Sequence, residues 1–481
     1  MRVLVNAFWL SFGRLTADLL SFVLFAFIAR TFGPTGTGQY SYGFALATLI
    51  ALISTSGFED HGIRQYARAQ PHERAQLWED LLATQCLRLA LGALALLICT
   101  LIGAIDASNV TVVLELLIYV VGWWLSRTFF IPAMAAQSMI APAVADLACR
   151  VAAVTGALLL GSVAHASLPV MLSVFPIAGI TLLLLSLSSA VRHGARLRPG
   201  REWRRVLTTV RGSLPFAGSD LLNQFYARAD VLLIAYFLGD ASVGLYATVI
   251  KFVEVGLLPL LLLGMAAYPL LSRYAAHDPM AFGHAARDFM RLLLLLTGWL
   301  GVGVACLVPL VIVPVFGASF APSVQLLPWV AVFALTKGVE ATCYRLLYSA
   351  QRQTLYCTSL LLGTLLIVGL NLVLIPAMGL KGAVAAAILG TIALDSLSLA
   401  GVLRYLGGRF VVTSLARLAL ALVITAALVI GMRTIDLNPW TTALAACGLF
   451  PVLAAACGLV PNPRRSELLR HTETSDTTVS P

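Results

Sequence analysis

Fourteen apolar stretches, each about as long as the hydrocarbon core of a bilayer is thick, follow one another along this chain. An α-helix needs about 20 apolar residues to cross that core. The connections are short, and none is long enough to fold as a separate globular domain. The sequence therefore predicts an all-α polytopic membrane protein with about 14 transmembrane helices, near residues 4–29, 38–58, 81–104, 111–131, 143–164, 168–190, 212–238, 242–268, 290–314, 324–348, 354–375, 382–403, 411–432 and 440–460.

Composition excludes an ordinary soluble protein. Of the 481 residues, 59% are hydrophobic and 11% are charged, whereas soluble domains carry about 25% charged residues. The net charge of +10 is best explained by membrane topology rather than by nucleic-acid binding. The eight cysteines are scattered without a metal-binding spacing, and we expect no disulfide, metal site or cofactor.

The basic residues predict an orientation in the membrane. One set of connections, together with both termini, holds 20 Lys and Arg residues, and the opposite set holds only Arg30, Lys381 and Arg433. Because positive charge is retained in the cytoplasm, both termini are expected there. The basic run 192–205 is expected to anchor the chain to anionic lipid. The stretch 59–80 mixes charged and apolar residues and predicts a helix on the cytoplasmic surface.

The chain contains a long internal repeat. FIARTFGPTGTGQY (27–40) aligns with LIAYFLGDASVGLY (233–246) at a constant offset of 206 residues. In each copy one glycine is expected to allow the turn that ends the outward helix, and a later glycine to allow close packing of the returning helix. Two parallel six-helix bundles follow from this repeat. The expected domains are 1–191, a basic linker at 192–211, a second bundle at 212–405, an extra helix pair at 406–460 and a cytoplasmic tail at 461–481.

Several charged residues lie inside the predicted spans, where each costs at least about 2.5 kcal/mol unless it is paired or hydrated. Two interpretations remain open for them, internal salt bridges or a hydrated cavity that binds an anionic headgroup. Spacings of three or four residues favour the first, and concentration on spans one, seven and eight favours the second. Arg88, Arg127 and Arg417 are expected only to extend to the membrane surface. The candidate cavity residues are Arg14, Asp18, Arg228, Asp230, Lys251, Glu254, Lys337 and Glu340.

Motifs of enzymes are absent from the sequence. There is no GxxxxGK[ST], HExxH or GxSxG pattern, and the seven histidines fall in or near predicted loops. We therefore expect a protein that is not an enzyme and that does not hydrolyse ATP itself.

The layout and one early motif resemble a known family. The residues Ala29, Arg30, Gly33, Pro34, Gly38 and Tyr40, with SGFEDHGIRQYAR (56–68) and IPAMGLKGAVAAA (375–387), are similar to those of the Wzx-type polysaccharide (O-antigen or exopolysaccharide) flippases of the MOP exporter superfamily. The resemblance implies a multi-pass protein of the bacterial inner membrane that moves undecaprenyl-pyrophosphate-linked oligosaccharide repeat units by alternating access. It also implies contact with membrane lipids and with polymerase or chain-length partners of the same pathway. An outer-gate role for Arg30 comes from the same resemblance.

Alternatives stay open at this point. A MATE-like drug or cation antiporter and a lipid II flippase share the predicted bundle. A membrane glycosyltransferase or polymerase usually needs a substantial outer loop, and the longest here has about ten residues. A scaffold gives no reason for the buried charges. Parallel halves around one cavity indicate that a monomer suffices.

Overall fold

The computed structural model describes most of the chain. It describes residues 2–55, 58–70, 72–103, 109–136, 138, 140–163, 166–200, 202–435 and 437–460, without the side chains of 2–12, 14, 55, 58, 60, 61, 67, 163, 215 and 216. The described residues form helices and no strand, as expected where backbone polar groups must bond within one segment. They divide into two compact units, Met1–Ala247 and Thr248–Pro481.

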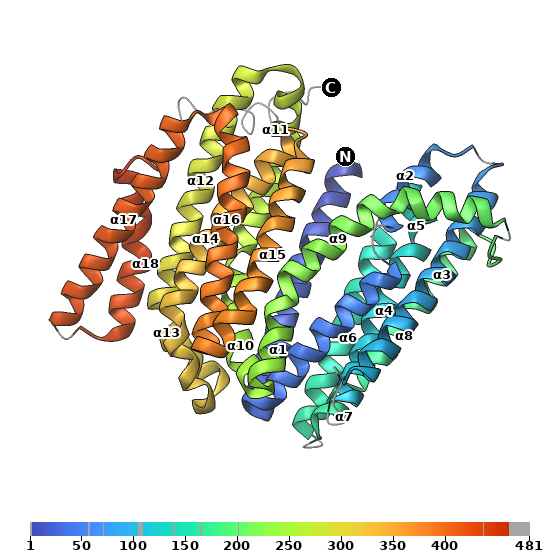
Figure 1. Ribbon diagram of the computed structural model, residues 1–481, viewed down its shortest axis with the longest axis horizontal. Helices are drawn as coiled ribbons and strands as arrows, with labels where there is room; N and C mark the ends of the chain where they lie inside the picture. The colour runs from blue at the N-terminus through green and yellow to red at the C-terminus, as the bar shows by residue number, and fades with distance from the viewer. Residues whose placement is uncertain are drawn as a thin grey trace, which may run out of the picture. The chain divides into compact units, whose positions relative to one another are not determined.

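The N-terminal unit (Met1–Ala247) is built around long helices that pack on one another. Helix α4 packs on α1 and α8, α6 packs on the same two helices, and α9 packs on α1 and α3 (Figure 1). The elements are α1 (Arg2–Thr55), α2 (Phe58–Arg68), α3 (Arg74–Leu101), α4 (Val110–Phe129), α5 (Ile131–Ala135), α6 (Ile140–Val163), α7 (Leu168–Leu172), α8 (Val174–Arg192), α9 (Trp203–Leu238) and the first part of α10 (Asp240–Gly256).

The C-terminal unit (Thr248–Pro481) continues from the second half of α10. Its centre is the pair α15 and α16 together with α12 and α14, and α17 and α18 pack as a hairpin on α12 (Figure 1). Its elements are α11 (Leu258–His277), α12 (Pro279–Cys306), α13 (Val308–Phe316), the 3₁₀ helix η1 (Ala318–Leu326), α14 (Leu327–Ser349), α15 (Gln353–Met378), α16 (Leu380–Leu406), α17 (Gly408–Thr434) and α18 (Pro439–Ala456).

Twelve described segments are long and apolar enough to cross a membrane. The count of about 14 predicted from the sequence differs for two reasons. The segment Leu15–Ser54 has 40 residues, enough for two crossings, and the chain reverses its direction at Gly33 within it (Figure 1). Helix α9, predicted as a span, is not among the twelve, because Asn223, Gln224, Arg228 and Asp230 lower the hydropathy of its apolar part. The protein is a polytopic, all-α membrane protein.

The repeated glycines have the expected geometry. Gly33 (φ 65°, ψ −166°) and Gly239 (φ 76°, ψ 176°) share a backbone conformation that L-residues avoid. A Cβ on Gly38 would lie 1.8 Å from the carbonyl oxygen of Asp240, and a Cβ on Gly244 would lie 2.0 Å from that of Pro34. The close packing predicted for the second glycine of each copy is confirmed, and within the N-terminal unit the two copies of the turn pack against each other.

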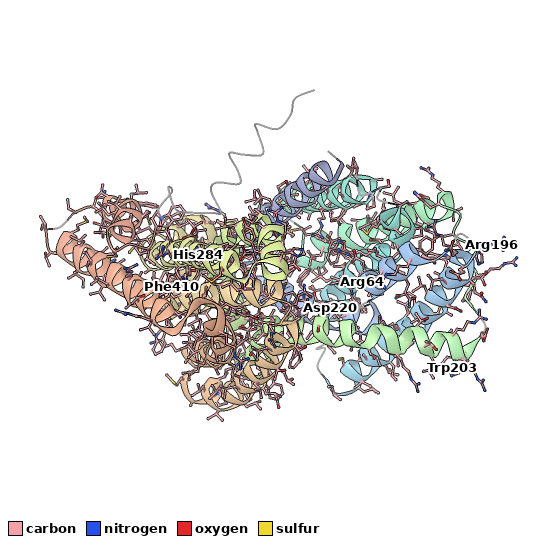
Figure 2. The ribbon with its side chains drawn as sticks, turned by 90° about the horizontal axis from the view of Figure 1, so that it is seen from above. Arg64, Arg196, Trp203, Asp220, His284 and Phe410 are labelled. Carbon is pink, nitrogen blue, oxygen red and sulfur yellow. The ribbon has the colours of Figure 1, made fainter. Side chains whose placement is uncertain are left out.

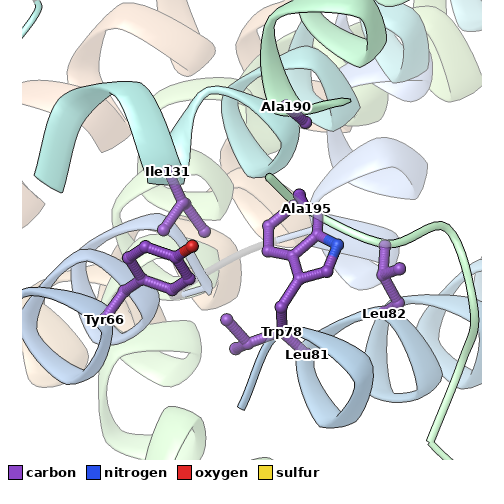
Figure 3. Close-up of a cluster of buried hydrophobic side chains, with 7 residues drawn as sticks. All are labelled: Tyr66, Trp78, Leu81, Leu82, Ile131, Ala190 and Ala195. Carbon is purple, nitrogen blue, oxygen red and sulfur yellow. The ribbon is translucent and has the colours of Figure 1, made fainter. Parts of the chain in front are cut away.

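The predicted surface helix at 59–80 is wrong as a single element. Helix α2 ends at Arg68 and α3 begins at Arg74, because Pro71 disfavours helical backbone at the residue before it. Tyr66 and Trp78 then pack edge to face, with ring centroids 6.5 Å apart, in a cluster with Leu81, Leu82, Ile131, Ala190 and Ala195 (Figure 3). Burial raises the pKa of the Tyr66 phenol, against the opposing charge of Arg74, so the cluster stays neutral.

The basic linker is shorter than the predicted range 192–211. Helix α8 ends at Arg192 and α9 begins at Trp203, so residues 203–211 form the first turns of α9. The intervening segment packs on α3, where the N–H of Gly200 donates to the carbonyl oxygen of Glu79 at 2.7 Å. Trp203 and Arg196 lie at the outer edge of the N-terminal unit in Figure 2. The predicted division into two six-helix bundles stays a prediction.

Candidate functional site: charged groups within the helices

Arg228 on α9 is the most distinctive of the predicted cavity residues. Its guanidinium carbon lies 5.5 Å from the ring centroid of Phe44 on α1, which itself stacks on Tyr40. The Nε atom of Arg228 is buried and has no hydrogen-bond partner, and no carboxylate among the described side chains forms an ion pair with this arginine. A cation held by an aromatic face, with unused donors, can bind an anion.

Asp230 is satisfied by its own unit. The Tyr246 hydroxyl donates to one carboxylate oxygen, and the N–H of Val231 donates to the other at 2.8 Å. Tyr246 is only 1% exposed. Because a buried phenol and a carboxylate that bond to each other fix α9 against α10, the structure favours a structural role for Asp230 over a cavity role.

The first span is only partly described. The side chain of Arg14 lies outside the described residues, so its predicted pairing with Asp18 stays a prediction. Asp18 is half-buried on α1, and Arg30 is exposed near the bend at Gly33. The outer-gate role of Arg30 also stays a prediction.

The predicted pairs of the C-terminal unit are formed. Lys251 and Glu254 on α10 lie 3.0 Å apart. Lys337 and Glu340 on α14 lie 2.6 Å apart, and the Tyr356 hydroxyl on α15 donates to the other Glu340 oxygen at 3.2 Å. These contacts follow the three-residue spacing that the sequence predicted.

Asp395 on α16 is a site residue that the sequence reasoning did not select. It is 7% exposed and lies within electrostatic reach of Glu340 and Lys337. Its Oδ1 atom is buried and has no hydrogen-bond partner among the described groups. Lys337 therefore faces two buried carboxylates from two helices. In the sequence, the only sign of a role for Asp395 is that it is a single charge in an apolar span. Its partners Lys337 and Glu340 lie about sixty residues away in sequence, so no local spacing indicates them.

Three arginines predicted only to extend to the membrane surface have specific partners. Arg88 is 7% exposed and lies within electrostatic reach of Asp220 on α9, a residue labelled in Figure 2. Arg127 makes a bidentate ion pair with Glu59. Arg417 donates to the carbonyl oxygen of Gly458 at 3.1 Å. The burial of Arg88 contradicts the surface prediction for that residue, whereas for Arg127 and Arg417 it stays a prediction.

A second charged group joins α4 and α6 in the N-terminal unit. Asp146 accepts hydrogen bonds from the Trp123 indole at 2.7 Å and from Arg150 at 3.1 Å. The Arg150 guanidinium also lies 4.8 Å from the Trp123 ring centroid. The two charges pair with each other and Asp146 also accepts from Trp123, so the arrangement links the two helices. Within the described part of the chain, no group of three or more His, Cys, Asp or Glu side chains could hold a metal ion.

Comparisons with known proteins agree on the fold. A family model described as "Polysaccharide biosynthesis protein" matches residues 3–275. Among solved structures, the lipid II flippase MurJ in an inward closed conformation matches with a TM-score of 0.73, 14% identity and coverage of 94% of this chain and 98% of that one. A search of curated proteins returned no match.

Two further structures belong to the MOP superfamily. An inward-facing multidrug resistance MATE family transporter matches with a TM-score of 0.61, 12% identity and coverage of 81% of this chain and 94% of that one. A MOP superfamily transporter from Pyrococcus furiosus matches with a TM-score of 0.53, 12% identity and coverage of 83% and 95%. At these identities the likeness concerns the fold.

Proposed function

Because this chain belongs to the polysaccharide biosynthesis protein family, we propose that it is a Wzx-type flippase of lipid-linked oligosaccharides. It moves undecaprenyl-pyrophosphate-linked repeat units from the cytoplasmic to the periplasmic leaflet of the bacterial inner membrane, for lipopolysaccharide or exopolysaccharide assembly. Both termini lie in the cytoplasm, transport proceeds by alternating access, and the chain catalyses no covalent step. A monomer suffices, and the pathway's polymerase and chain-length proteins are the expected partners.

Arg228 is the observation that carries this proposal. A pyrophosphate needs cationic donors that are not already neutralised, and the buried Nε of Arg228 has no partner. Arg14 and Lys251 are the other proposed anion contacts, with Glu254 restraining Lys251 through their ion pair. Lys337 and Glu340 form a similar pair deeper in the C-terminal unit. Asp18 remains a candidate for pairing with Arg14, whereas Asp230 supports α9 through Tyr246.

Complementation of a strain that lacks this gene tests the proposal. Arg228→Ala is expected to lower surface polysaccharide at least about tenfold, because a donor to a charged group is lost, with protein abundance unchanged. Arg228→Lys keeps the charge and is expected to retain part of the activity. Arg352→Ala, an exposed arginine just before α15, is the matched control and is expected to behave as wild type.

Other outcomes point to other functions. Full surface polysaccharide in the strain lacking the gene would contradict the proposal. Rescue of a strain depleted of its lipid II flippase would assign lipid II as the substrate, and drug sensitivity as the main defect would favour an antiporter. Loss of the Arg228→Ala protein itself would make this arginine structural.

A further inference from the structure

A cavity lies in the C-terminal unit where α16 ends and α17 begins. Its volume is about 460 Å³, and it is lined by Arg287 of α12, the run 406–410 and Thr413 of α17. Figure 1 shows this junction at the same end of the unit as the start of α12, and Figure 2 labels Phe410 within it. Because helices α16 and α17 end and begin here, the cavity lies at the level of the lipid headgroups.

Arg287 lines this cavity, and most of its N–H donors make no hydrogen bond within the described part of the protein. Its Nε donates to the carbonyl oxygen of Leu406 at 3.2 Å, and its guanidinium carbon lies 5.7 Å from the Phe410 ring centroid. These contacts hold the guanidinium in place and use only one of its five N–H groups. Among the described residues no acceptor is found for its terminal nitrogens, so they are available to a ligand.

The charge around the cavity is not cancelled by an acid. Asp288, the nearest carboxylate in sequence, forms its ion pair with Arg291 at 3.7 Å. Arg291 lies on α12 one turn after Arg287, with its guanidinium carbon 5.1 Å from the Phe410 ring centroid. Arg409 is exposed and adds a second cation to the cavity wall. The cavity is therefore cationic and lacks an acidic lining residue.

The backbone adds further donors to the two arginines. Gly407 (φ 81°) separates α16 from α17 and supplies no side-chain cap. The N–H groups of Gly408, Arg409 and Phe410 begin the 27-residue helix α17 and lie ahead of its first backbone hydrogen bond, from Val411 to Gly407. Such amides and the helix dipole favour an anion.

An apolar surface continues from the cavity along α17. Val412 and Val423 are each 65% exposed, and Ile430 is 64% exposed. In a membrane protein such a face contacts acyl chains. A ligand that combines a phosphate with acyl chains therefore matches both the cavity and the face beside it.

We propose that this cavity binds the phosphate of an anionic phospholipid, with Arg287 and Arg409 as its charged contacts. The site is separate from the translocated substrate of the proposed function, and binding to it is measured without transport. Phosphate is the recognised group, and the phospholipid headgroup is its source.

Lipid binding to the purified full-length protein tests this site. The probes are phosphatidylglycerol, zwitterionic phosphatidylcholine, inorganic phosphate and a polyprenyl phosphate, each titrated into the detergent-solubilised protein and followed by native mass spectrometry. Phosphatidylglycerol is expected to bind in preference to phosphatidylcholine. Arg409→Gln is expected to weaken that binding about three- to tenfold, since a charge-assisted contact near the surface is lost.

Two further variants make the test specific. A Cβ on Gly408 would meet no atom within 4 Å, so Gly408→Glu places a negative charge at the cavity without a clash and is expected to abolish the preference. Arg404→Gln, an exposed arginine on the last turns of α16 outside the lining, is the matched control and is expected to bind as wild type.

The remaining outcomes overturn the proposal. Equal weakening by Arg404→Gln would indicate diffuse attraction to the basic surface rather than a site. If millimolar inorganic phosphate displaced phosphatidylglycerol, and the lipid bound no more tightly than phosphate, the cavity would be a site for free anions. Tighter, variant-sensitive binding of the polyprenyl phosphate would make the cavity part of substrate recognition.

Discussion

Gly38 shows how a single absent side chain can define a helix contact. Its α-carbon faces the backbone carbonyl of Asp240, and Gly244 faces that of Pro34 in the same way. Backbone atoms cannot change rotamer to make room, so a methyl group at either position must separate the turns. The contact therefore tolerates no residue larger than glycine.

Gly38→Ala is expected to destabilise the protein by about 1–3 kcal/mol, as overpacking does. A lowered midpoint of thermal unfolding in detergent and a lower abundance in the membrane would both report this loss. Gly369→Ala on α15 is the control, because a Cβ there meets no atom within 4 Å. Unchanged stability of Gly38→Ala would show that the two turns are not in contact.

At the residue scale, the sequence predicted an ion pair correctly where its two residues are close together in the chain. The pairs Lys337–Glu340 and Lys251–Glu254 follow from helical spacing alone. Arg127 could not be assigned in this way, because its partner Glu59 precedes it by 68 residues and no local pattern indicates which helices become neighbours. The buried Asp395 escaped selection for the same reason.

At the scale of elements, Trp78 connects the short helix α2 to the membrane-spanning helices. It is fully buried beside Ile131 of α5 and Ala190 of α8 (Figure 3). The sequence placed its aromatic side chain on a surface helix, because the mixed composition of 59–80 resembles one. The break between α2 and α3 turns this residue inward, so the pattern alone identified an amphipathic segment but not its end.

Trp78→Ala is expected to cost about 3–5 kcal/mol, the range for truncating a buried tryptophan. The thermal midpoint of the purified protein should fall accordingly. Trp203→Ala is the control of the same residue type, because Trp203 is 60% exposed at the start of α9, and its midpoint should stay near that of wild type. Similar behaviour of the two variants would place Trp78 outside the core.

At the scale of the whole molecule, hydropathy predicted the fold class because it depends on composition over long windows rather than on particular contacts. The family match over residues 3–275 and the coverage of 94% of the chain by the MurJ fold agree with that class. The identity of the translocated glycan depends on a few side chains in a site, so no long-window property predicts it.

Reporter fusions test the proposed orientation. Alkaline phosphatase fused after Gly103 or after Leu437 is expected to be active, because it would reach the periplasm, whereas fusion after Arg192 is expected to be inactive. A fluorescent protein at the C-terminus is expected to fluoresce, as it does only in the cytoplasm of most bacteria. An inverted pattern would reverse the direction of the proposed transport.

The packing of Gly38 against Asp240 also determines when, during synthesis, the N-terminal unit can be completed. The ribosome must add about 200 residues after Gly38 before its partner exists, which takes on the order of 10–40 s at the usual elongation rates. During that interval the first helices stand in the bilayer without the backbone surface that they are shaped to meet. The N-terminal unit is thus completed only after the second copy of the turn has been synthesised, and we expect a chain arrested before residue 240 to lack this contact and to be less stable in the membrane.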